Sequence, residues 1–201
     1  MTPLSSSPRP TAIVPVRTGP TVKRRLAHVL GAQERRELVR TMFEHVVSVL
    51  DDCGLRVVAL SPNPLPDTRY YEVWTDAGPS LNAAVDDAVR RTGTPVLIVH
   101  ADLPRVAVDD IEALLDADGD IVIGRARDGG TNALLMRECI RCAFGASSAL
   151  AHAARARAAG LRTHVVDRPG LALDVDDGAS LTASAWRASV ESVASSRRPP
   201  A

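Results

Sequence analysis

Short apolar runs alternate along this chain with longer stretches in which apolar residues recur every three or four positions. The run at 95–99, Pro-Val-Leu-Ile-Val, is apolar throughout, as expected of a strand that is covered on both faces of a parallel sheet. In the stretch that starts near Gln33, Leu38, Met42 and Val46 fall on one face of a helix. The whole pattern predicts strands at 11–16, 55–60, 70–74, 95–99, 120–124, 132–136, 161–166 and 171–175, and helices at 33–53, 81–92, 111–115, 148–159 and 181–193.

Strands that alternate with helices of about a dozen residues are typical of α/β proteins with a mostly parallel central sheet. Neither an internal repeat nor a linker long enough to separate two domains interrupts the alternation. Residues 1–10 and 195–201 are rich in Ser and Pro. We therefore expect a single α/β domain at 11–194, with helices on both faces of its sheet, between disordered tails at 1–10 and 195–201.

Composition narrows the range of functions. The chain has 24 basic and 24 acidic residues, no formal net charge, and only two residues each of Trp, Tyr and Phe. This balance does not favour nucleic-acid binding, which depends on neutralised phosphates and stacked bases. No apolar run reaches the roughly 18–20 residues of a membrane helix, and the N-terminus lacks the apolar core of a signal peptide. With three cysteines expected to be reduced, the sequence predicts a cytoplasmic protein that binds neither membranes nor nucleic acids.

Lys23 is the one lysine in the chain, and the other basic residues are all arginines. Lysine offers a compact charge on a flexible stem, whereas arginine presents a wider planar group. Lys23 is therefore either a residue that arginine cannot replace or a chance survivor of a compositional bias, and composition favours neither interpretation.

Polar side chains follow most of the predicted strands, at the edge where an open α/β sheet binds its ligands. Lys23 and Arg25 come after the first strand, Asp102 after the strand at 95–99, and Asp174 and Asp176 at the last one. A turn of sequence Gly-Gly-Thr-Asn at 129–132 joins them. Carboxylates in such a place bind Mg²⁺ in phosphate chemistry, and Lys or Arg neutralises the remaining phosphate charge.

Each candidate has a simpler interpretation. Asp102 could cap the helix that follows it, Asp174 and Asp176 could begin a solvated helix, and 129–131 could be an ordinary turn. Cys139 and Cys142 have a zinc-like spacing, but no second pair accompanies them, so we take it as incidental. His152 is expected to be structural or solvated. The chain has neither a Walker A motif nor a Gly-x-Gly-x-x-Gly motif, which excludes the common ATPase and dehydrogenase readings.

Seven sequence blocks in this order resemble the phosphoenolpyruvate/2-phospho-L-lactate guanylyltransferases of coenzyme F-420 biosynthesis. The resemblance covers about residues 11 to 185, and two parts depart from the usual pattern. Arg17 and Arg24 stand where the family commonly has Lys and Ser or Thr, and the last block continues with Asp-Gly-Ala-Ser-Leu at 177–181 where the family usually has Thr-Pro-Glu-Asp-Leu. The blocks are 13–16 (Ile-Val-Pro-Val), 23–27 (Lys-x-Arg-Leu-Ala), 78–82 (Gly-Pro-Ser-Leu-Asn), 101–104 (Ala-Asp-Leu-Pro), 129–133 (Gly-Gly-Thr-Asn-Ala), 144–148 (Phe-Gly-x-x-Ser) and 171–176 (Leu-Ala-Leu-Asp-Val-Asp).

The resemblance implies a Rossmann-like nucleotidyltransferase fold that binds GTP and a small phosphorylated acid. By position, Lys23 and Arg25 would meet the triphosphate and take part in catalysis with Asp102, while Leu81 and Asn82 would lie near the base. Asp102, Asp174 and Asp176 would hold Mg²⁺. The phosphorylated acid would contact Thr131, Gly145 and Ser148.

The implied reaction moves GMP from GTP to phosphoenolpyruvate or 2-phospho-L-lactate and releases pyrophosphate. We expect phosphoenolpyruvate as the acceptor, because the Arg-rich, Ala-rich composition resembles actinobacterial members that are associated with it. The product would pass to the downstream deazaflavin-transferring enzyme, and the protein would be a monomer or a homodimer. The alternatives are another Mg²⁺-dependent nucleotidyltransferase, acting on 3-phosphoglycerate, molybdopterin or a sugar phosphate, and a GTP-binding protein without catalytic activity.

Overall fold

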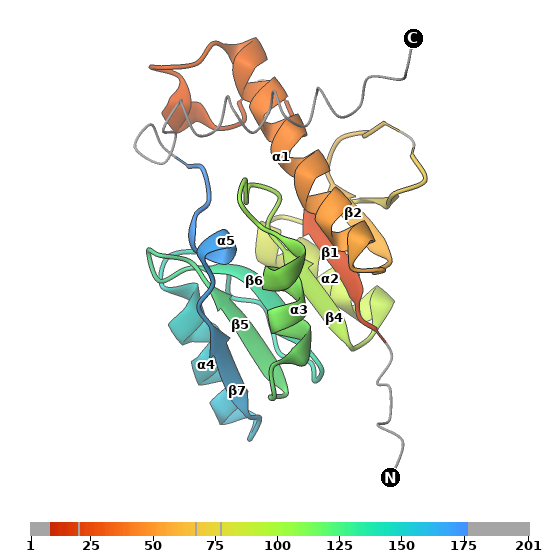
Figure 1. Ribbon diagram of the computed structural model, residues 1–201, viewed down its shortest axis with the longest axis vertical. Coiled ribbons are helices and arrows are strands. Elements are labelled where there is room, and N and C mark those ends of the chain that lie inside the picture. Colours follow the sequence, from red (N-terminus) through yellow and green to blue (C-terminus); the bar gives the residue numbers. More distant parts are fainter. Residues whose placement is uncertain (1–8, 20, 67, 77, 177–201) are drawn as a thin grey trace.

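The computed structural model describes residues 9–176 except 20, 67 and 77. Strands and helices alternate along most of this range (Figure 1). The strands are β1 (Thr11–Pro15), β2 (Val57–Ser61), β3 (Glu72–Thr75), β4 (Val96–Val99), β5 (Ile121–Arg125), β6 (Thr131–Met136) and β7 (Thr163–Val166). The helices are the 3₁₀ turn η1 (Arg24–Leu26), α1 (Ala32–Asp52), α2 (Leu81–Thr92), α3 (Val108–Asp116), α4 (Ser148–Ala158) and α5 (Pro169–Ala172).

The seven strands form one mixed sheet in the order β3-β2-β1-β4-β6-β5-β7. All neighbouring pairs are parallel except those that β6 makes with β4 and with β5. The sheet is therefore mostly parallel, as the alternation of strands and helices predicts. Because β6 runs in the opposite direction, its first residues lie at the edge where the parallel strands end.

Both faces of the sheet are buried under helices. Ala12 and Val14 of β1 pack with α1 and α3 on one face, whereas Ile13, which points the other way, packs with α2 and α4. Residues of β4 alternate between the two clusters in the same manner. This two-sided burial explains why the strand at 96–99 is apolar throughout.

The prediction of an extended piece at 171–175 is wrong over its first residues, because Pro169–Ala172 form the short helix α5. Pro169 occupies the first helical position, where its fixed φ favours a helix start and its missing N–H costs no hydrogen bond. Gly170 then lets α5 approach α3, since a Cβ there would lie 1.9 Å from the Asp110 carboxylate. The helix expected at 181–193 and both expected tails, apart from Arg9 and Pro10, lie outside the described residues.

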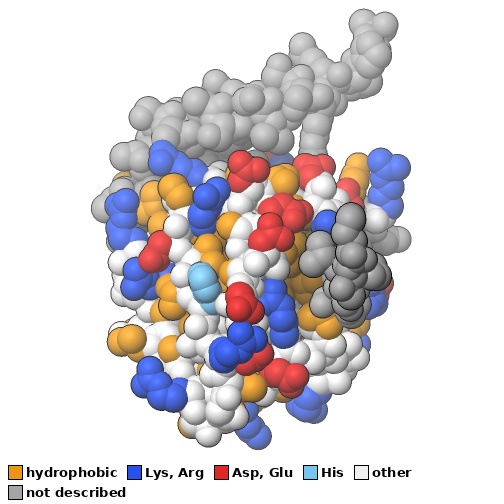
Figure 2. Space-filling view, turned by 60° about the horizontal axis from the view of Figure 1, so that its bottom comes forward, with side chains coloured by type: hydrophobic (Ala, Val, Ile, Leu, Met, Phe, Trp, Pro, Cys, Tyr) orange, Lys and Arg blue, Asp and Glu red, His pale blue; other side chains and the backbone are white. Residues whose placement is uncertain are grey.

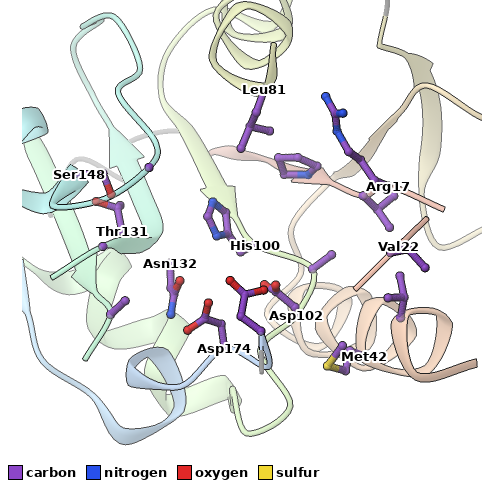
Figure 3. A pocket seen from close by; sticks show the side chains of 18 of the residues that line it. Arg17, Val22, Met42, Leu81, His100, Asp102, Thr131, Asn132, Ser148 and Asp174 are labelled. Atoms are coloured by element: carbon purple, nitrogen blue, oxygen red, sulfur yellow. The ribbon is translucent and has the colours of Figure 1, made fainter. Parts of the chain in front are cut away.

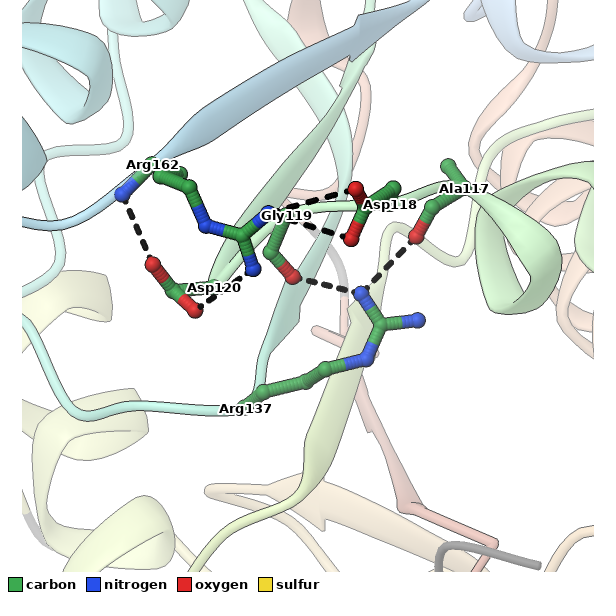
Figure 4. A network of polar contacts seen from close by, with 6 residues as sticks. All are labelled: Ala117, Asp118, Gly119, Asp120, Arg137 and Arg162. Atoms are coloured by element: carbon green, nitrogen blue, oxygen red, sulfur yellow. Dashed lines mark hydrogen bonds and ion pairs between the residues drawn. The ribbon is translucent and has the colours of Figure 1, made fainter. Parts of the chain in front are cut away.

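At the edge where the parallel strands begin, two arginines connect the loops through hydrogen bonds and ion pairs (Figure 4). Arg137 donates to the carbonyl oxygens of Ala117 and Gly119, at 2.9 and 2.6 Å, and also to that of Leu115 at 2.7 Å. These carbonyls belong to the end of α3 and the loop after it, so Arg137 caps that helix from β6. Arg162, before β7, pairs with Asp118 and Asp120.

The exposed surface carries charges of both signs. On the face seen in Figure 2, basic and acidic side chains are interspersed with apolar ones rather than segregated by sign. This agrees with the neutral balance of the sequence. Among the described residues, no helix combines the length and the hydropathy needed to cross a membrane.

Candidate active site

A pocket of about 470 Å³ opens at the carboxyl edge of the sheet. Its walls come from residues that follow β1, β4 and β5 and from the start of β6, which the reversed direction of that strand brings to the same edge. Figure 3 shows Asp102 and Asp174 side by side, with His100 above them and Thr131 and Ser148 to the left, and with Asn132 between Thr131 and Asp174. The residues that the sequence places at successive strand ends therefore do meet in one cavity.

Three carboxylates form a cluster at the pocket. Asp102, Asp174 and Asp176 each offer an oxygen atom, and these atoms all lie within 4.8 Å of one another. The backbone N–H of Val175 donates to the Asp102 carbonyl at 3.3 Å and holds the two segments together. Asp102 does not cap the following helix, because α3 begins at Val108 with Ala107 as its N-cap. That simpler interpretation of Asp102 is excluded.

Lys23 neutralises part of this cluster. Its Nζ donates to Asp102 at 2.5 Å and to Asp176 at 2.7 Å, and only 11% of its side chain is exposed. Burial opposes the charge on Lys23, but Asp102 and Asp176 outweigh it and raise the pKa of the ammonium. Burial likewise opposes ionisation of Asp102, but the Lys23 charge holds the pKa of that carboxyl below its usual value. The pair is therefore ionised at neutral pH.

Asp174 carries the uncompensated part of the cluster. Burial raises the pKa of its carboxyl, and the neighbouring charge of Asp102 raises it further. Repulsion of this kind is relieved when a cation binds between the carboxylates. Oxygen donors alone, from three side chains, are the ligands that Mg²⁺ prefers. The donor set therefore fits a divalent cation.

The remaining candidates for the nucleotide lie around the same pocket, with one exception. Arg25 and Leu81 line it, and so does Arg17, which lies 3.9 Å from the Asp76 carboxylate. Asn82 is outside the lining residues. Its side-chain amide accepts from the N–H of Phe144 at 2.7 Å and donates to the carbonyl of the same residue at 3.1 Å. Both ends of Asn82 are thus engaged by the backbone of a neighbouring loop.

Thr131, Gly145 and Ser148 also line the pocket. Gly145 has φ +140°, a conformation that favours glycine, and it turns the chain before α4. Ser148 is the first residue of α4, and its Oγ is buried without a hydrogen-bond partner among the described residues. The same holds for Nε2 of His100. Buried polar atoms are normally paired, so these two atoms indicate a polar ligand in the pocket.

The loop at 142–145 is fixed from two helices. From α2, Asp86 accepts from the N–H of Cys142 at 2.8 Å, beside the two bonds of Asn82 to Phe144. From α4, Nε2 of His152 accepts from the N–H of Ala143 at 2.9 Å. A loop held at three successive residues presents Gly145 to the pocket in one fixed conformation.

Sequence patterns gave His152 no part in this site and placed Asn132 there only as the last residue of the turn at 129–132. His152 is fully buried, and its Nδ1 lies 3.0 Å from the Oγ1 of Thr131. Asn132 donates to the carbonyl of Leu171 at 2.9 Å and so ties β6 to the segment that carries Asp174. The single polar residue in the Ala-rich run at 149–154 is the one signal in the sequence that could have pointed to His152.

Comparison with known proteins identifies the family. Residues 10–184 match the family described as guanylyl transferase CofC like. This chain belongs to that family. A phosphoenolpyruvate guanylyltransferase of Sphaerobacter thermophilus is 36% identical over 89% of this chain and 94% of its own length. A 2-phospho-L-lactate guanylyltransferase of Methanocella arvoryzae is 32% identical over 85% of this chain and 77% of its own length.

Solved structures confirm the fold of this guanylyl transferase. A crystal structure from Desulfovibrio desulfuricans G20, described as a nucleotide-diphospho-sugar transferase, has a TM-score of 0.72 at 18% identity and covers 92% of this chain and 95% of its own. The 2-C-methyl-D-erythritol 4-phosphate cytidylyltransferase of Thermus thermophilus has a TM-score of 0.51 at 17% identity and covers 90% of this chain and 100% of its own. The expected nucleotidyltransferase fold is therefore confirmed.

Proposed function

We propose that this guanylyl transferase moves GMP from GTP to phosphoenolpyruvate and releases pyrophosphate, as a step of coenzyme F-420 biosynthesis. One observation carries the proposal. A single pocket holds a carboxylate cluster with its lysine and, among the described residues, the buried and unpartnered polar atoms of Ser148 and His100. Such a pocket offers groups for a nucleotide triphosphate with its cation and for a small anion.

The reaction forms one bond and breaks one. An oxygen of the acceptor phosphate attacks the α-phosphorus of GTP, and the bond from that phosphorus to the bridging oxygen of the β-phosphate breaks, so that pyrophosphate leaves. A phosphate monoester is already ionised near pH 7, since its second pKa is about 6, so the attack needs no general base. The barrier lies in bringing two highly charged anions together in line.

Asp102, Asp174 and Asp176 are the residues proposed to hold Mg²⁺. A divalent cation at this cluster supplies positive charge that offsets the repulsion between the donor and acceptor phosphates. The carboxylates orient toward one point of the pocket because Asp102 follows β4 and Asp174 is tied to it through the backbone bond of Val175. The protein is thus proposed to hold the three carboxylates next to the bound triphosphate.

Lys23 and Arg25 are proposed to contact the triphosphate and to stabilise the charge that builds on the departing pyrophosphate. Lys23 starts beside the carboxylates, within reach of phosphates bound there. Leu81 lines the same pocket and is proposed to contact the base. Asn82 acts on the site through Phe144, whose backbone it holds, rather than through its own amide.

Thr131, Gly145 and Ser148 are proposed to bind the phosphorylated acid. Ser148 begins α4, so the positive end of that helix faces the pocket and favours an anion there. The unpartnered Ser148 hydroxyl adds a hydrogen-bond donor at the same point. The acceptor carries a carboxylate and a phosphate, of which one is proposed to lie against Thr131, Gly145 and Ser148 and the other to point toward the carboxylate cluster.

The relatives support two acceptors that share this chemistry. The Sphaerobacter thermophilus relative is named a phosphoenolpyruvate guanylyltransferase and aligns over most of both chains, which supports phosphoenolpyruvate. The Methanocella arvoryzae relative is named for 2-phospho-L-lactate, which differs at the middle carbon. A change of that size in a pocket is worth only about 1–3 kcal/mol, so a direct competition is needed. The guanylated product would then serve the deazaflavin-transferring enzyme.

The test is a competition of acceptors in one reaction. The protein is incubated with GTP, Mg²⁺ and equal amounts of phosphoenolpyruvate, 2-phospho-L-lactate and 3-phosphoglycerate, and the guanylated products are separated by mass. We expect guanylated phosphoenolpyruvate to dominate. A dominant phospholactate product would overturn the choice of acceptor and leave the guanylyl transfer standing. Turnover of GTP without any guanylated acid would overturn the proposed function.

A further inference from the structure

His152 is a buried histidine whose two ring nitrogens are both engaged by neighbouring residues, although it is not among the residues proposed to contact the substrates. It lies on α4 and is fully buried. It contacts two segments that carry the acceptor wall, by which we mean the part of the pocket formed by Thr131, Gly145 and Ser148. Its Nε2 is 2.9 Å from the backbone nitrogen of Ala143, and its Nδ1 is 3.0 Å from the Oγ1 of Thr131. The ring of Phe144 packs on its edge, with ring centroids 5.0 Å apart. The imidazole therefore bridges the 142–145 loop and β6.

The contact with Ala143 fixes which nitrogen carries the proton. A backbone N–H can only donate, so Nε2 must accept with its lone pair and carries no hydrogen. The ring is then neutral with its proton on Nδ1. Burial, with a further contribution from Arg155, lowers the pKa of His152 to about 4, which agrees with a neutral ring.

The same argument fixes the direction of the bond to Thr131. With its proton on Nδ1, the imidazole donates to Oγ1, and the threonine oxygen accepts. The hydroxyl hydrogen of Thr131 must then point elsewhere. Within the described part of the chain Oγ1 has no second partner, and Thr131 lines the pocket beside Ser148.

We propose that His152 is a positioning residue that makes the Thr131 hydroxyl a hydrogen-bond donor toward the anionic acceptor. This rests on the proposed function for the identity of the acceptor. With the proton on Nε2 instead, Thr131 would donate to His152, and its oxygen lone pairs would face the negative oxygens of the acceptor. The tautomer of a residue that does not touch substrate thus sets the polarity of the acceptor wall.

Two substitutions separate the two bonds of His152. The amide nitrogen of Asn reaches the place of Nδ1, so His152→Asn keeps a donor for Thr131 and loses the acceptor for Ala143. The amide oxygen of Gln reaches the place of Nε2, so His152→Gln keeps the Ala143 bond and removes the donor. Steady-state kinetics with phosphoenolpyruvate and with GTP then assign the effect to one bond.

We expect His152→Gln to raise KM for phosphoenolpyruvate about tenfold, as for a hydrogen bond to a charged group, while KM for GTP stays unchanged. Thr131→Val is expected to raise KM for phosphoenolpyruvate by the same factor. The double variant should raise it no further, because the two substitutions remove the same interaction. His152→Asn is expected to keep KM for phosphoenolpyruvate closer to that of the unaltered protein. Equal effects of Asn and Gln, or equal effects on both substrates, would show a structural role only and overturn the proposal.

A measurement on the unaltered protein decides the case if the variants do not fold. Long-range ¹H–¹⁵N NMR correlations of histidine distinguish the two neutral tautomers without substrate. We expect the proton on Nδ1 of His152, and a proton on Nε2 would overturn the proposal. Because this spectrum needs no turnover, it is independent of the proposed function, whose failure would appear as the absence of any guanylated acid from the unaltered protein.

Discussion

Lys23 and Asp102 lie 79 positions apart in the sequence and 2.5 Å apart in the structure. Their pairing brings the single lysine to the carboxylate cluster, where only 11% of its side chain is exposed. The ammonium contacts two of the three carboxylates that fit a divalent cation. If a cation binds there as proposed, Lys23 would compete with it before a nucleotide is bound and would be available to the phosphates afterwards.

Asp102 is the residue whose substitution isolates the chemistry from the fold. Asp102→Asn keeps the size of the side chain and removes its charge, so we expect turnover to be abolished and the melting temperature to change little. Asp176, which is half-exposed, still accepts from Lys23, so the ammonium keeps a charged partner. Asp52→Asn, an exposed aspartate at the end of α1, is the matched control. Full activity of Asp102→Asn would contradict the assignment.

Lys23→Met is expected to change metal and nucleotide binding in opposite directions. Loss of the ammonium leaves the carboxylates more negative, so Mn²⁺ should bind roughly fivefold more tightly in the absence of nucleotide. Loss of its contact with the triphosphate should lower kcat/KM for GTP by about 10- to 100-fold. Mn²⁺ titration monitored by electron paramagnetic resonance measures the first, and initial rates the second. Weaker Mn²⁺ binding to the variant would show that Lys23 supports the metal site instead of competing with it.

At the level of elements, periodicity predicted the strands and helices from β1 to β7 within a few residues, because burial on both faces leaves clear apolar runs. Three features escaped it, of which the first is the single 3₁₀ turn η1 at Arg24–Leu26. The reversed direction of β6 follows from its hairpin with β5 through the turn at 126–130, and apolar patterns do not encode strand direction. The turn of helix at Pro169–Ala172 is too short to show a helical period, although Pro169 is a signal for its start.

Arg137 is expected to matter more for stability than its neighbour Arg162. Its guanidinium donates to three carbonyls at the end of α3 and in the loop after it, and Arg137→Ala leaves these without a partner among the described residues. We expect the free energy of unfolding to fall by about 2 kcal/mol, measured by urea denaturation. Arg162→Ala is the control, since its ion pairs are solvent-exposed and its loss should be clearly smaller. Equal losses for the two variants would contradict the capping role of Arg137.

For the whole molecule, burial of His152 makes stability depend on pH. The pKa of His152 is lowered to about 4 in the fold, whereas a histidine in the unfolded chain has a pKa of about 6.5. Between these values the unfolded chain binds a proton that the folded one does not, so stability is complete above pH 6.5 and is lost as the pH falls. We expect a loss of about 1 kcal/mol at about pH 5.5, and up to about 3 kcal/mol near pH 4.

Urea denaturation at a series of pH values measures this loss. His152→Gln does not titrate, so the difference between its profile and that of the unaltered protein isolates the contribution of His152. Parallel profiles for the two proteins between pH 7 and pH 5 would contradict a buried neutral imidazole.

The sequence predicts most of the site for the same reason that it predicts the sheet. Residues at the ends of parallel strands must meet at one edge, so Asp102 and Thr131 could be placed together before the structure was known. Contacts that helix side chains make with neighbouring loops could not be predicted from the sequence. The hydrogen bonds of Asn82 to Phe144 and of His152 to Ala143 depend on how α2 and α4 pack, and no pattern in the sequence indicates that packing.

The central claim is that this pocket joins GMP to the phosphate of a small acid. The measurement that tests it most directly is ³¹P NMR of a reaction with GTP, Mg²⁺ and phosphoenolpyruvate. We predict two new, mutually coupled signals of a diphosphate linkage, appearing with an equal amount of pyrophosphate and absent with Asp102→Asn. Release of GDP and inorganic phosphate, or an unchanged spectrum of GTP and phosphoenolpyruvate, would contradict the account.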